Sequence, residues 1–207
     1  HGVDDTPAAS TGSSSEDIWA GRSIIGNATT ANKLTLKNGT THRDAYGGWT
    51  AGTGTSKALK NNSTGNTVNL AGGTVRNIYG GFTSSTDGSA TGNKVNISGG
   101  SIAPAAGVGG TVYGAKNAGT GAATGSTITI TGGTLHDVYG GHAASGATTG
   151  NTVNLGDGTN AMASGTSITG TLAGGNQTTA TDNTLNVNTN AAVGNIKNFA
   201  KISFKPS

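Results

Sequence analysis

Short stretches in which aliphatic and polar residues alternate run along this chain. In NTVNL, residues 66–70, Val68 and Leu70 fall on one side of an extended backbone, and Thr67 and Asn69 fall on the other. The stretch is too short for a stable helix, and its β-branched residues favour a strand. The pattern therefore predicts a short strand with one buried face.

This strand pattern recurs along most of the chain, always as a polar residue followed by two aliphatic residues at alternate positions. It begins at Asn32, Asn66, Asn93, Ser126, Asn151 and Asn183. A second pattern, TVRNIYGG at residues 74–81, predicts another strand that buries Val75 and Ile78. The tyrosine position of this second pattern holds all four tyrosines of the protein: Tyr46, Tyr79, Tyr113 and Tyr139. In two less regular copies of the pattern, the same position holds Trp19 and Ala173. Such periodicity indicates a repeat array.

The predicted fold class is all-β, a single right-handed parallel β-helix (β-solenoid) of about six coils. The bare coil is about 25 residues, the spacing from Ser126 to Asn151. Residues 1–15 are predicted to be a polar, loosely ordered leader or the tail of a preceding coil. Residues 16–207 are predicted to be one β-helix repeat domain, which we interpret as a fragment of a longer protein. The core should contain the aliphatic residues of the first strand: Leu34, Val68, Leu70, Val95, Ile97, Ile128, Ile130, Val153, Leu155, Leu185 and Val187.

Three insertions interrupt the regular spacing, at residues 50–61, 102–110 and 157–169. The last two are predicted to arise at the same corner, two coils apart. Insertions on one face of a solenoid are often where binding occurs. The alternative interpretation is loop drift, because lengthening a loop costs little free energy.

Equivalent side chains of stacked coils should form ladders. The asparagines that open the first strand are predicted to bond amide to amide, and the residues in the tyrosine position to form an aromatic stack. Most of these residues are therefore interpreted as architecture.

Composition narrows the class of protein. Only 32% of residues are hydrophobic and 10% are charged, and 38 are glycine, which fits a thin core built by stacking. The net charge is +3 without a Lys/Arg cluster, so we expect no nucleic-acid partner. The chain has no cysteine, which is compatible with an exported protein, and no apolar run long enough for a membrane-spanning helix.

The residue that follows each Tyr-Gly-Gly corner is the candidate ligand contact. These side chains are large and mixed in character: Arg22, Trp49, Phe82, Lys116 and His142. Trp49 and Phe82 should be neighbours, and exposed adjacent aromatic residues indicate a contact site, for example one that stacks on sugar rings. The competing interpretation is that the two rings fold back to cover a corner of the core.

Catalytic chemistry has one candidate, an acid pair at Asp17 and Asp44 beside Arg43 and Arg76. A solvated polar stripe is the preferred interpretation of that pair, so we assign no catalytic residue, no metal ligand and no cofactor. The threonine-rich outward face of the first strand resembles ice-binding surfaces, but lysine and asparagine interrupt it.

The alternation of G-N-x-V-x-Φ with Φ-Y-G-G, where Φ is aliphatic, resembles the passenger-domain repeats of Gram-negative type V autotransporters and filamentous-haemagglutinin-like adhesins. The resemblance covers roughly residues 17–204. It implies a secreted, non-enzymatic segment of a bacterial surface adhesin, extracellular and held at the outer membrane only through a barrel or anchor that this sequence lacks. The implied partner is a glycan or protein on a host or bacterial cell. The alternatives are a polysaccharide lyase or glycoside hydrolase on the same scaffold and a passive stalk. We expect a monomer, although open strand edges also permit end-to-end association.

Overall fold

The computed structural model describes residues 8–10, 16–24, 28–52, 61–103, 110–159, 162–177 and 181–205. Within these residues all regular secondary structure is β-strand, in one 15-stranded and one 4-stranded sheet. The paired strands run parallel throughout. The predicted all-β, parallel-stranded architecture is therefore confirmed.

The strands fall into three sets, one for each part of the repeat. The first set begins at the asparagine position and consists of β4 (Lys33–Leu36), β7 (Thr67–Leu70), β10 (Lys94–Ile102), β13 (Thr127–Leu135), β15 (Thr152–Leu155), β17 (Thr184–Val187) and β19 (Lys201–Phe204). The second set carries the tyrosine position and consists of β2 (Ile18–Ser23), β5 (Thr41–Thr50), β8 (Thr74–Thr83), β11 (Thr111–Asn117), β14 (Asp137–Ala143), β16 (Ser167–Gly175) and β18 (Ala192–Lys197).

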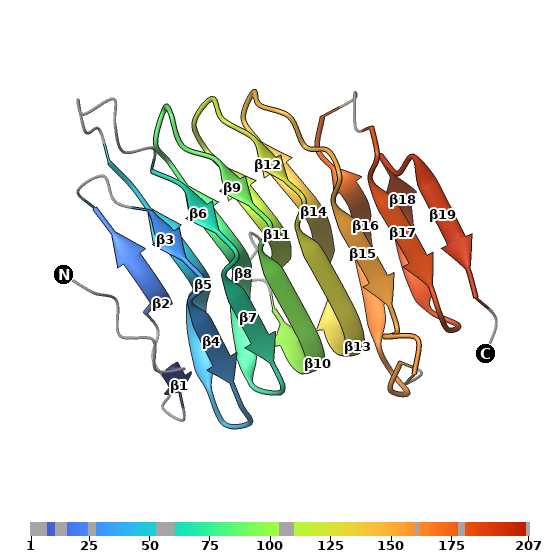
Figure 1. Ribbon diagram of the computed structural model, residues 1–207. Coiled ribbons are helices and arrows are strands. Elements are labelled where there is room, and N and C mark those ends of the chain that lie inside the picture. Colours follow the sequence, from blue (N-terminus) through green and yellow to red (C-terminus); the bar gives the residue numbers. More distant parts are fainter. Residues whose placement is uncertain are drawn as a thin grey trace.

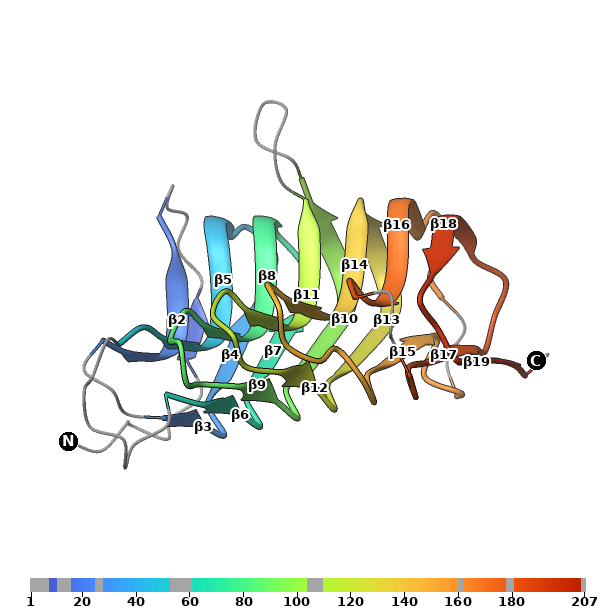
Figure 2. The ribbon, with the colours of Figure 1, turned by 90° about the horizontal axis from the view of Figure 1, so that it is seen from above.

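The third set was not predicted from the sequence. It consists of the two-residue strands β3 (Thr29–Thr30), β6 (Ser63–Thr64), β9 (Ala90–Thr91) and β12 (Ala123–Thr124), which form the 4-stranded sheet. Figure 2 shows this short sheet along one side of the molecule, apart from the longer second strands. Two residues carry too little alternation to be recognised as a strand in a sequence.

Each strand lies beside its equivalent in the next repeat, so the array grows along one direction from β1 to β19 (Figure 1). Val68 of β7 is opposite Leu34 of β4 on one side and Val95 of β10 on the other. Thr127 is opposite Thr152, which confirms the shortest predicted spacing. In-register pairing of identical positions is what aligns the side chains into columns.

The predicted core is confirmed with one exception. All of the listed aliphatic residues are fully or almost fully buried, apart from Val187, which is partly buried against the core. Val75 and Ile78 of the second strand are also completely buried. One core column holds a histidine, because His42 is opposite Val75 and only 7% exposed.

The predicted asparagine ladder is present. The amide of Asn32 donates to Oδ1 of Asn66 (2.8 Å), Asn66 donates to Asn93 (3.1 Å), and Asn151 donates to Asn183 (3.2 Å). Ser126 continues the column, because its hydroxyl accepts from the backbone N–H of Asn93 (3.2 Å). The buried amides are therefore satisfied within the ladder, as buried polar groups must be.

Part of the predicted polar leader lies in the sheet, as expected for the tail of a preceding coil. Residues 8–10 form strand β1 (Ala8–Ser10), in which Ala8 lies opposite Leu34 of β4. This part of the leader is therefore an edge of the sheet, and the remainder of residues 1–15 lies outside the described residues. The sequence AAS has no aliphatic alternation, so nothing in its pattern indicated a strand.

The prediction that two insertions share one corner is wrong. Ile102 lies opposite Val75 and Thr111 opposite Asn77, so the residues between them interrupt the second strand. The later insertion instead lies before Ser167, which is opposite Thr134, and so precedes the second strand. The spacing between two motifs gives the length of an insertion, but it does not show at which position between the motifs the insertion occurs. Residues 104–109 and 160–161 of these two insertions, and residues 53–60 of the first insertion, lie outside the described residues.

Candidate binding edge

The Gly-Gly corner of the second strand places the tyrosine position and the position after it on one side of the molecule. Ala45 belongs to the core, and side chains at Gly47 and Gly48 would point at Asn66 in the interior. Tyr46 and Trp49 therefore project to the opposite side, before and after the corner. Only glycine fits both corner positions here, because any Cβ would overlap the backbone or the buried amide.

The residues of the tyrosine position form the predicted aromatic stack. Ring centroids of successive members are separated by 6.1 Å for Trp19 and Tyr46, 4.6 Å for Tyr46 and Tyr79, 5.1 Å for Tyr79 and Tyr113, and 5.9 Å for Tyr113 and Tyr139. All pairs lie within 17° of parallel. Tyr46 and Tyr79 are at most 8% exposed, and burial raises the pKa of both hydroxyl groups. The middle of the stack is therefore buried, whereas Trp19, Tyr113 and Tyr139 are partly exposed.

The five candidate contact residues lie side by side in register, each opposite the next. We call this set the edge row: Arg22, Trp49, Phe82, Lys116 and His142. Trp49 and Phe82 are neighbours, as the sequence predicted, and their rings are stacked with centroids 6.3 Å apart and within 5° of parallel. Arg22 is exposed, and the other four are half-buried.

The edge row also packs against the aromatic stack behind it. The ring of Phe82 meets Tyr46 and Tyr79 edge-on, at 5.9 and 5.6 Å, and His142 meets Tyr113 and Tyr139 in the same way. Edge-to-face pairs of this kind are worth roughly 0.5–1.5 kcal/mol each beyond their buried area. Phe82 therefore covers part of the stack, as the packing interpretation predicts, and Trp49 and Phe82 both keep partly accessible surface. A ligand contact at this pair stays a prediction.

The two cations of the edge row lie over aromatic faces. The guanidinium carbon of Arg22 is 4.8 Å from the Trp19 ring and 5.1 Å from the Trp49 ring. Nζ of Lys116 is 4.5 Å from the Tyr113 ring and 5.5 Å from the Tyr79 ring. Burial lowers the pKa of Lys116, and burial together with the Lys116 charge lowers the pKa of His142. At neutral pH His142 is therefore neutral, and the positive charges of the row are Arg22 and Lys116.

The acid pair considered for catalysis has partners within the sheet. Asp17 and Asp44 occupy equivalent positions in neighbouring strands, as the sequence predicted. Arg43 donates two hydrogen bonds to Asp17 (2.8 and 3.0 Å), and Arg76 donates two to Asp44 (3.0 and 2.8 Å). Asn77 donates a third bond to Asp44 (2.9 Å). These carboxylates join neighbouring repeats, and both oxygens of each are engaged in that role.

Among the residues that the structure describes, no three His, Asp or Glu side chains lie close enough together to bind a metal ion. His136 pairs instead with its neighbour Asp137, whose Oδ2 lies 3.2 Å from Nδ1.

Sequence reasoning missed one concave surface. An open hollow of roughly 270 Å³ lies between the second strands, lined by Ser101, Ile102, Ala103, Thr134, Leu135, His136, Ser167 and Thr169. It lies where regular strand pairing is interrupted, by the insertion after Ile102 and by the register shift near Gly170. Its lining is mixed and it contains no convergent charged groups, so we assign it no ligand.

Comparison of the chain with protein-family models gives no match, and no curated protein and no solved structure matches it. The resemblance to autotransporter passenger repeats therefore stays an expectation from the motifs. Over the described residues, the structure also contains no helix that is long and apolar enough to cross a membrane.

Proposed function

We propose that this chain is a right-handed β-helical segment of a secreted bacterial surface adhesin, which presents the edge row to a glycan or protein on another cell. The observation that carries the proposal is the stacked pair Trp49 and Phe82, which keeps accessible surface between the charges of Arg22 and Lys116. Partly exposed aromatic residues flanked by cations are typical of binding surfaces.

The orientation of the rings narrows the kind of contact. Trp49 has Phe82 against one face and the guanidinium of Arg22 against the other, so its faces are already occupied. A ligand would therefore contact the ring edges and the two cations. The sequence had suggested instead that a sugar ring stacks on an open aromatic face. This geometry favours a ligand with carboxylate or sulfate groups, such as an acidic glycan or an acidic protein segment.

The test is a binding screen on glycans and cell surfaces with the wild-type chain and the double variant Trp49→Ala, Phe82→Ala. The matched control is Thr127→Ala, Thr152→Ala, which removes two side chains from the outward face of β13 and β15. Circular dichroism checks that all three proteins are folded. Binding that the edge-row variant loses and the control keeps supports the proposal, whereas equal binding by all three rejects the edge row as the site.

A passive stalk is the second candidate, and a specific observation favours it. Phe82 and His142 pack edge-on against the tyrosines, so the edge row also has a structural role. If no protein in the screen binds any surface, the stalk becomes the better proposal. The carboxylates of the polysaccharide-cleaving alternative are engaged with arginine, so no observation favours that function.

A further inference from the structure

The ammonium of Lys116, in the middle of the array, is a half-buried charge with no ion-pair partner among the described residues. It lies over the rings of Tyr113 and Tyr79, and burial lowers its pKa. Asp44 is the carboxylate whose charge acts on it, and both oxygens of Asp44 already accept hydrogen bonds from Arg76. A charge that has lost part of its water and has no counterion is stabilised when an anion binds to it.

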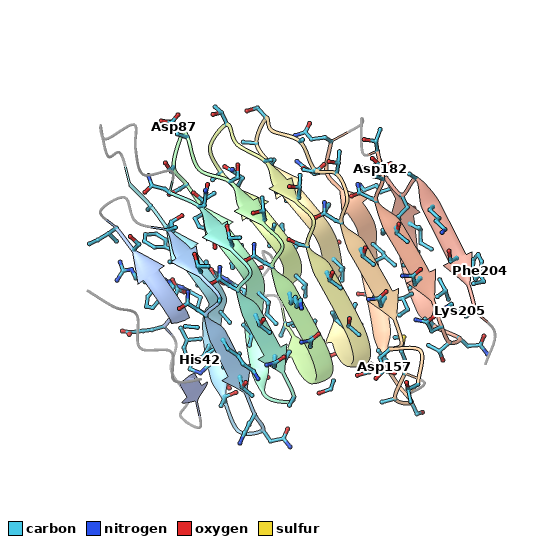
Figure 3. The ribbon with its side chains drawn as sticks, in the orientation of Figure 1. His42, Asp87, Asp157, Asp182, Phe204 and Lys205 are labelled. Atoms are coloured by element: carbon cyan, nitrogen blue, oxygen red, sulfur yellow. The ribbon has the colours of Figure 1, made fainter. Side chains whose placement is uncertain are left out.

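Other carboxylates of the described chain stand outside the strands. Figure 3 shows Asp87, Asp157 and Asp182 on the turns along the margins of the array, between strands rather than within them. The edge row therefore holds a positive charge at Lys116 that the protein does not neutralise with an acidic side chain of its own.

His142 stands beside Lys116, at the next position of the edge row. Its ring packs edge-on against Tyr113 and Tyr139, which fixes its orientation. The ring nitrogen Nδ1 is enclosed by protein and has no hydrogen-bond partner among the described residues, so Nε2 is the nitrogen left to meet a ligand. An ammonium and an imidazole thus lie side by side at the surface of a rigid sheet.

The groups that face His142 decide when it is charged. They are Lys116 and Tyr113 on β11, Tyr139 on its own strand, and beyond β16 the neutral Asn176, which bonds to the backbone of Ala143. Burial and the Lys116 charge lower the pKa of His142 from 6.5. A bound anion would raise this pKa again, because it screens the lysine and favours the imidazolium. Binding of an anion is therefore coupled to the uptake of one proton from solvent.

The strands around Lys116 and His142 restrict the kind of chain that carries the anion. Strand β11 pairs with both β8 and β14, and β14 also pairs with β16, so a peptide cannot add to them as another strand. A ligand can reach an ammonium, an imidazole and the partly exposed ring of Phe82 on the other side of Lys116. A sugar chain with sulfate or carboxylate groups fits this set, because its charged groups meet the cations while its CH groups contact the ring.

We propose that Lys116 and His142 form an anion subsite of the edge row, which takes a sulfate or carboxylate group of an acidic glycan and binds it more tightly in mildly acidic than in neutral solution. In the complex the anion lies against the ammonium and accepts a hydrogen bond from the imidazolium. This inference rests on the proposed function, because the subsite acts only if the edge row binds a ligand.

The first test measures the binding of dextran sulfate by calorimetry, with uncharged dextran as the control ligand. Sulfate esters stay ionised in mild acid, so a change of affinity with pH comes from the protein. Wild type should bind about three- to tenfold more tightly at about pH 5.5 than at about pH 7.5. His142→Asn should lose this increase and stay folded, because Asn176 holds the equivalent position in the next repeat. The matched control, His136→Asn, changes an exposed histidine outside the edge row and should keep it.

The second test follows the proton on His142 directly. Lys116→Met removes the charge and retains an unbranched side chain that can cover the tyrosine rings. In an NMR titration, the pKa of His142 should be higher in this variant than in wild type, and that of His136 should be unchanged. The variant should also bind dextran sulfate severalfold more weakly at both pH values. Circular dichroism at both pH values checks that every variant is folded.

The outcomes separate this subsite from the proposed function. Binding that needs Trp49 and Phe82 but does not change with pH overturns the subsite and leaves the proposed function standing. A pH dependence that His142→Asn keeps, or that His136→Asn loses equally, also overturns the subsite. So does poly-glutamate that binds as tightly as dextran sulfate in neutral solution, which would assign the row to an acidic peptide. Absence of dextran sulfate binding at both pH values overturns the subsite too, and the screen of glycans and cell surfaces then decides the proposed function by itself.

Discussion

Oδ1 of Asn93 accepts two hydrogen bonds from Asn66, one from the backbone N–H (2.9 Å) and one from the side-chain amide (3.1 Å). The amide of Asn93 donates in turn to the carbonyl of Ser63 (2.9 Å). One completely buried side chain thus satisfies polar groups from two neighbouring segments. In a protein with so little apolar core, such ladders contribute much of what holds successive repeats together.

Asn93→Ala should therefore be strongly destabilising. It removes the acceptor of the Asn66 N–H and the donor to the Ser63 carbonyl, while the Asn66 amide keeps its bonds to Thr29 and Ser63, at a cost of about 2–4 kcal/mol in the free energy of unfolding. The matched control is Asn96→Ala on the outward face, where one exposed bond to Asn69 is lost and the expected cost is under about 1 kcal/mol. Urea denaturation measures both, and equal costs would contradict a special role for the buried ladder.

Two departures from the repeat pattern, at Ala115 and Ser126, occur together in one repeat. Ala115 stands in the register of Gly81 and Gly141, and Ser126 stands in the asparagine column of the same repeat. A methyl group on Gly81 would overlap the amide of Asn93, and one on Gly141 would come close to the amide of Asn151. A serine is shorter than an asparagine, so the repeat with serine has room for an alanine.

This relationship predicts a rescue. Gly81→Ala alone should cost about 2–3 kcal/mol because of the overlap, and Asn93→Ser alone should cost about 1–2 kcal/mol in lost hydrogen bonds. The double variant reproduces the pair at Ala115 and Ser126, so it should be more stable than the sum of the single effects by at least about 1 kcal/mol. Chemical denaturation of the four proteins in this cycle checks the coupling. Additive effects would show that the two departures are unrelated.

The two Asp–Arg pairs offer a matched comparison of burial. The side chains of Asp44 and Arg76 are 8% and 31% exposed, and Asp44 also binds Asn77. The side chains of Asp17 and Arg43 are 16% and 52% exposed. Asp44→Ala should cost about 2–3 kcal/mol, because it leaves partly buried donors unpaired. Asp17→Ala should have a small effect, because water and salt screen an exposed pair. Thermal unfolding at low and high salt compares them, and a larger loss at Asp17 would refute this ordering.

His42 should make stability depend on pH. Burial lowers its pKa, so above about pH 6.5 the folded and unfolded chains both hold it neutral and its contribution is complete. As pH falls below 6.5 the unfolded chain binds the proton first, and stability drops by up to about 1.4 kcal/mol per pH unit until the folded pKa is passed. His42→Val, which matches Val75 in the same column, should flatten this slope between pH 7.5 and 5.

The dependence of stability on pH that remains in the His42→Val variant should come partly from His142, because burial also lowers the pKa of this residue. A variant with an unchanged slope would exclude His42 as its source. The measurement is urea denaturation at a series of pH values above the range in which carboxylates titrate.

Parallel pairing, the core columns and both ladders could be predicted from the sequence, because side-chain alternation within a strand and repetition between strands are local patterns. Val68 and Leu70 had to share a face, and in-register stacking had to bring Asn66 beside Asn93. The neighbours Trp49 and Phe82, and the equivalence of Asp17 and Asp44, followed from the same counting. The strand at residues 8–10 and the third, two-residue strands could not be predicted, because they carry no pattern of their own and exist only through their neighbours.

The sequence by itself thus determined which residues stack on which, because equivalent positions of successive repeats lie opposite each other. Only the tertiary structure decided how buried these stacked side chains are and which other side chains they contact. Only the path of the backbone through the Gly-Gly corners, at Gly47 and Gly48 before Trp49 and at Gly80 and Gly81 before Phe82, leaves Phe82 half-buried against the tyrosines and both faces of Trp49 occupied. Only the pairing register separates the insertion after Ile102 from the one before Ser167. The physical reason is that register and exposure depend on the neighbouring repeat and on the path of the backbone between strands, which spacing along one chain does not record.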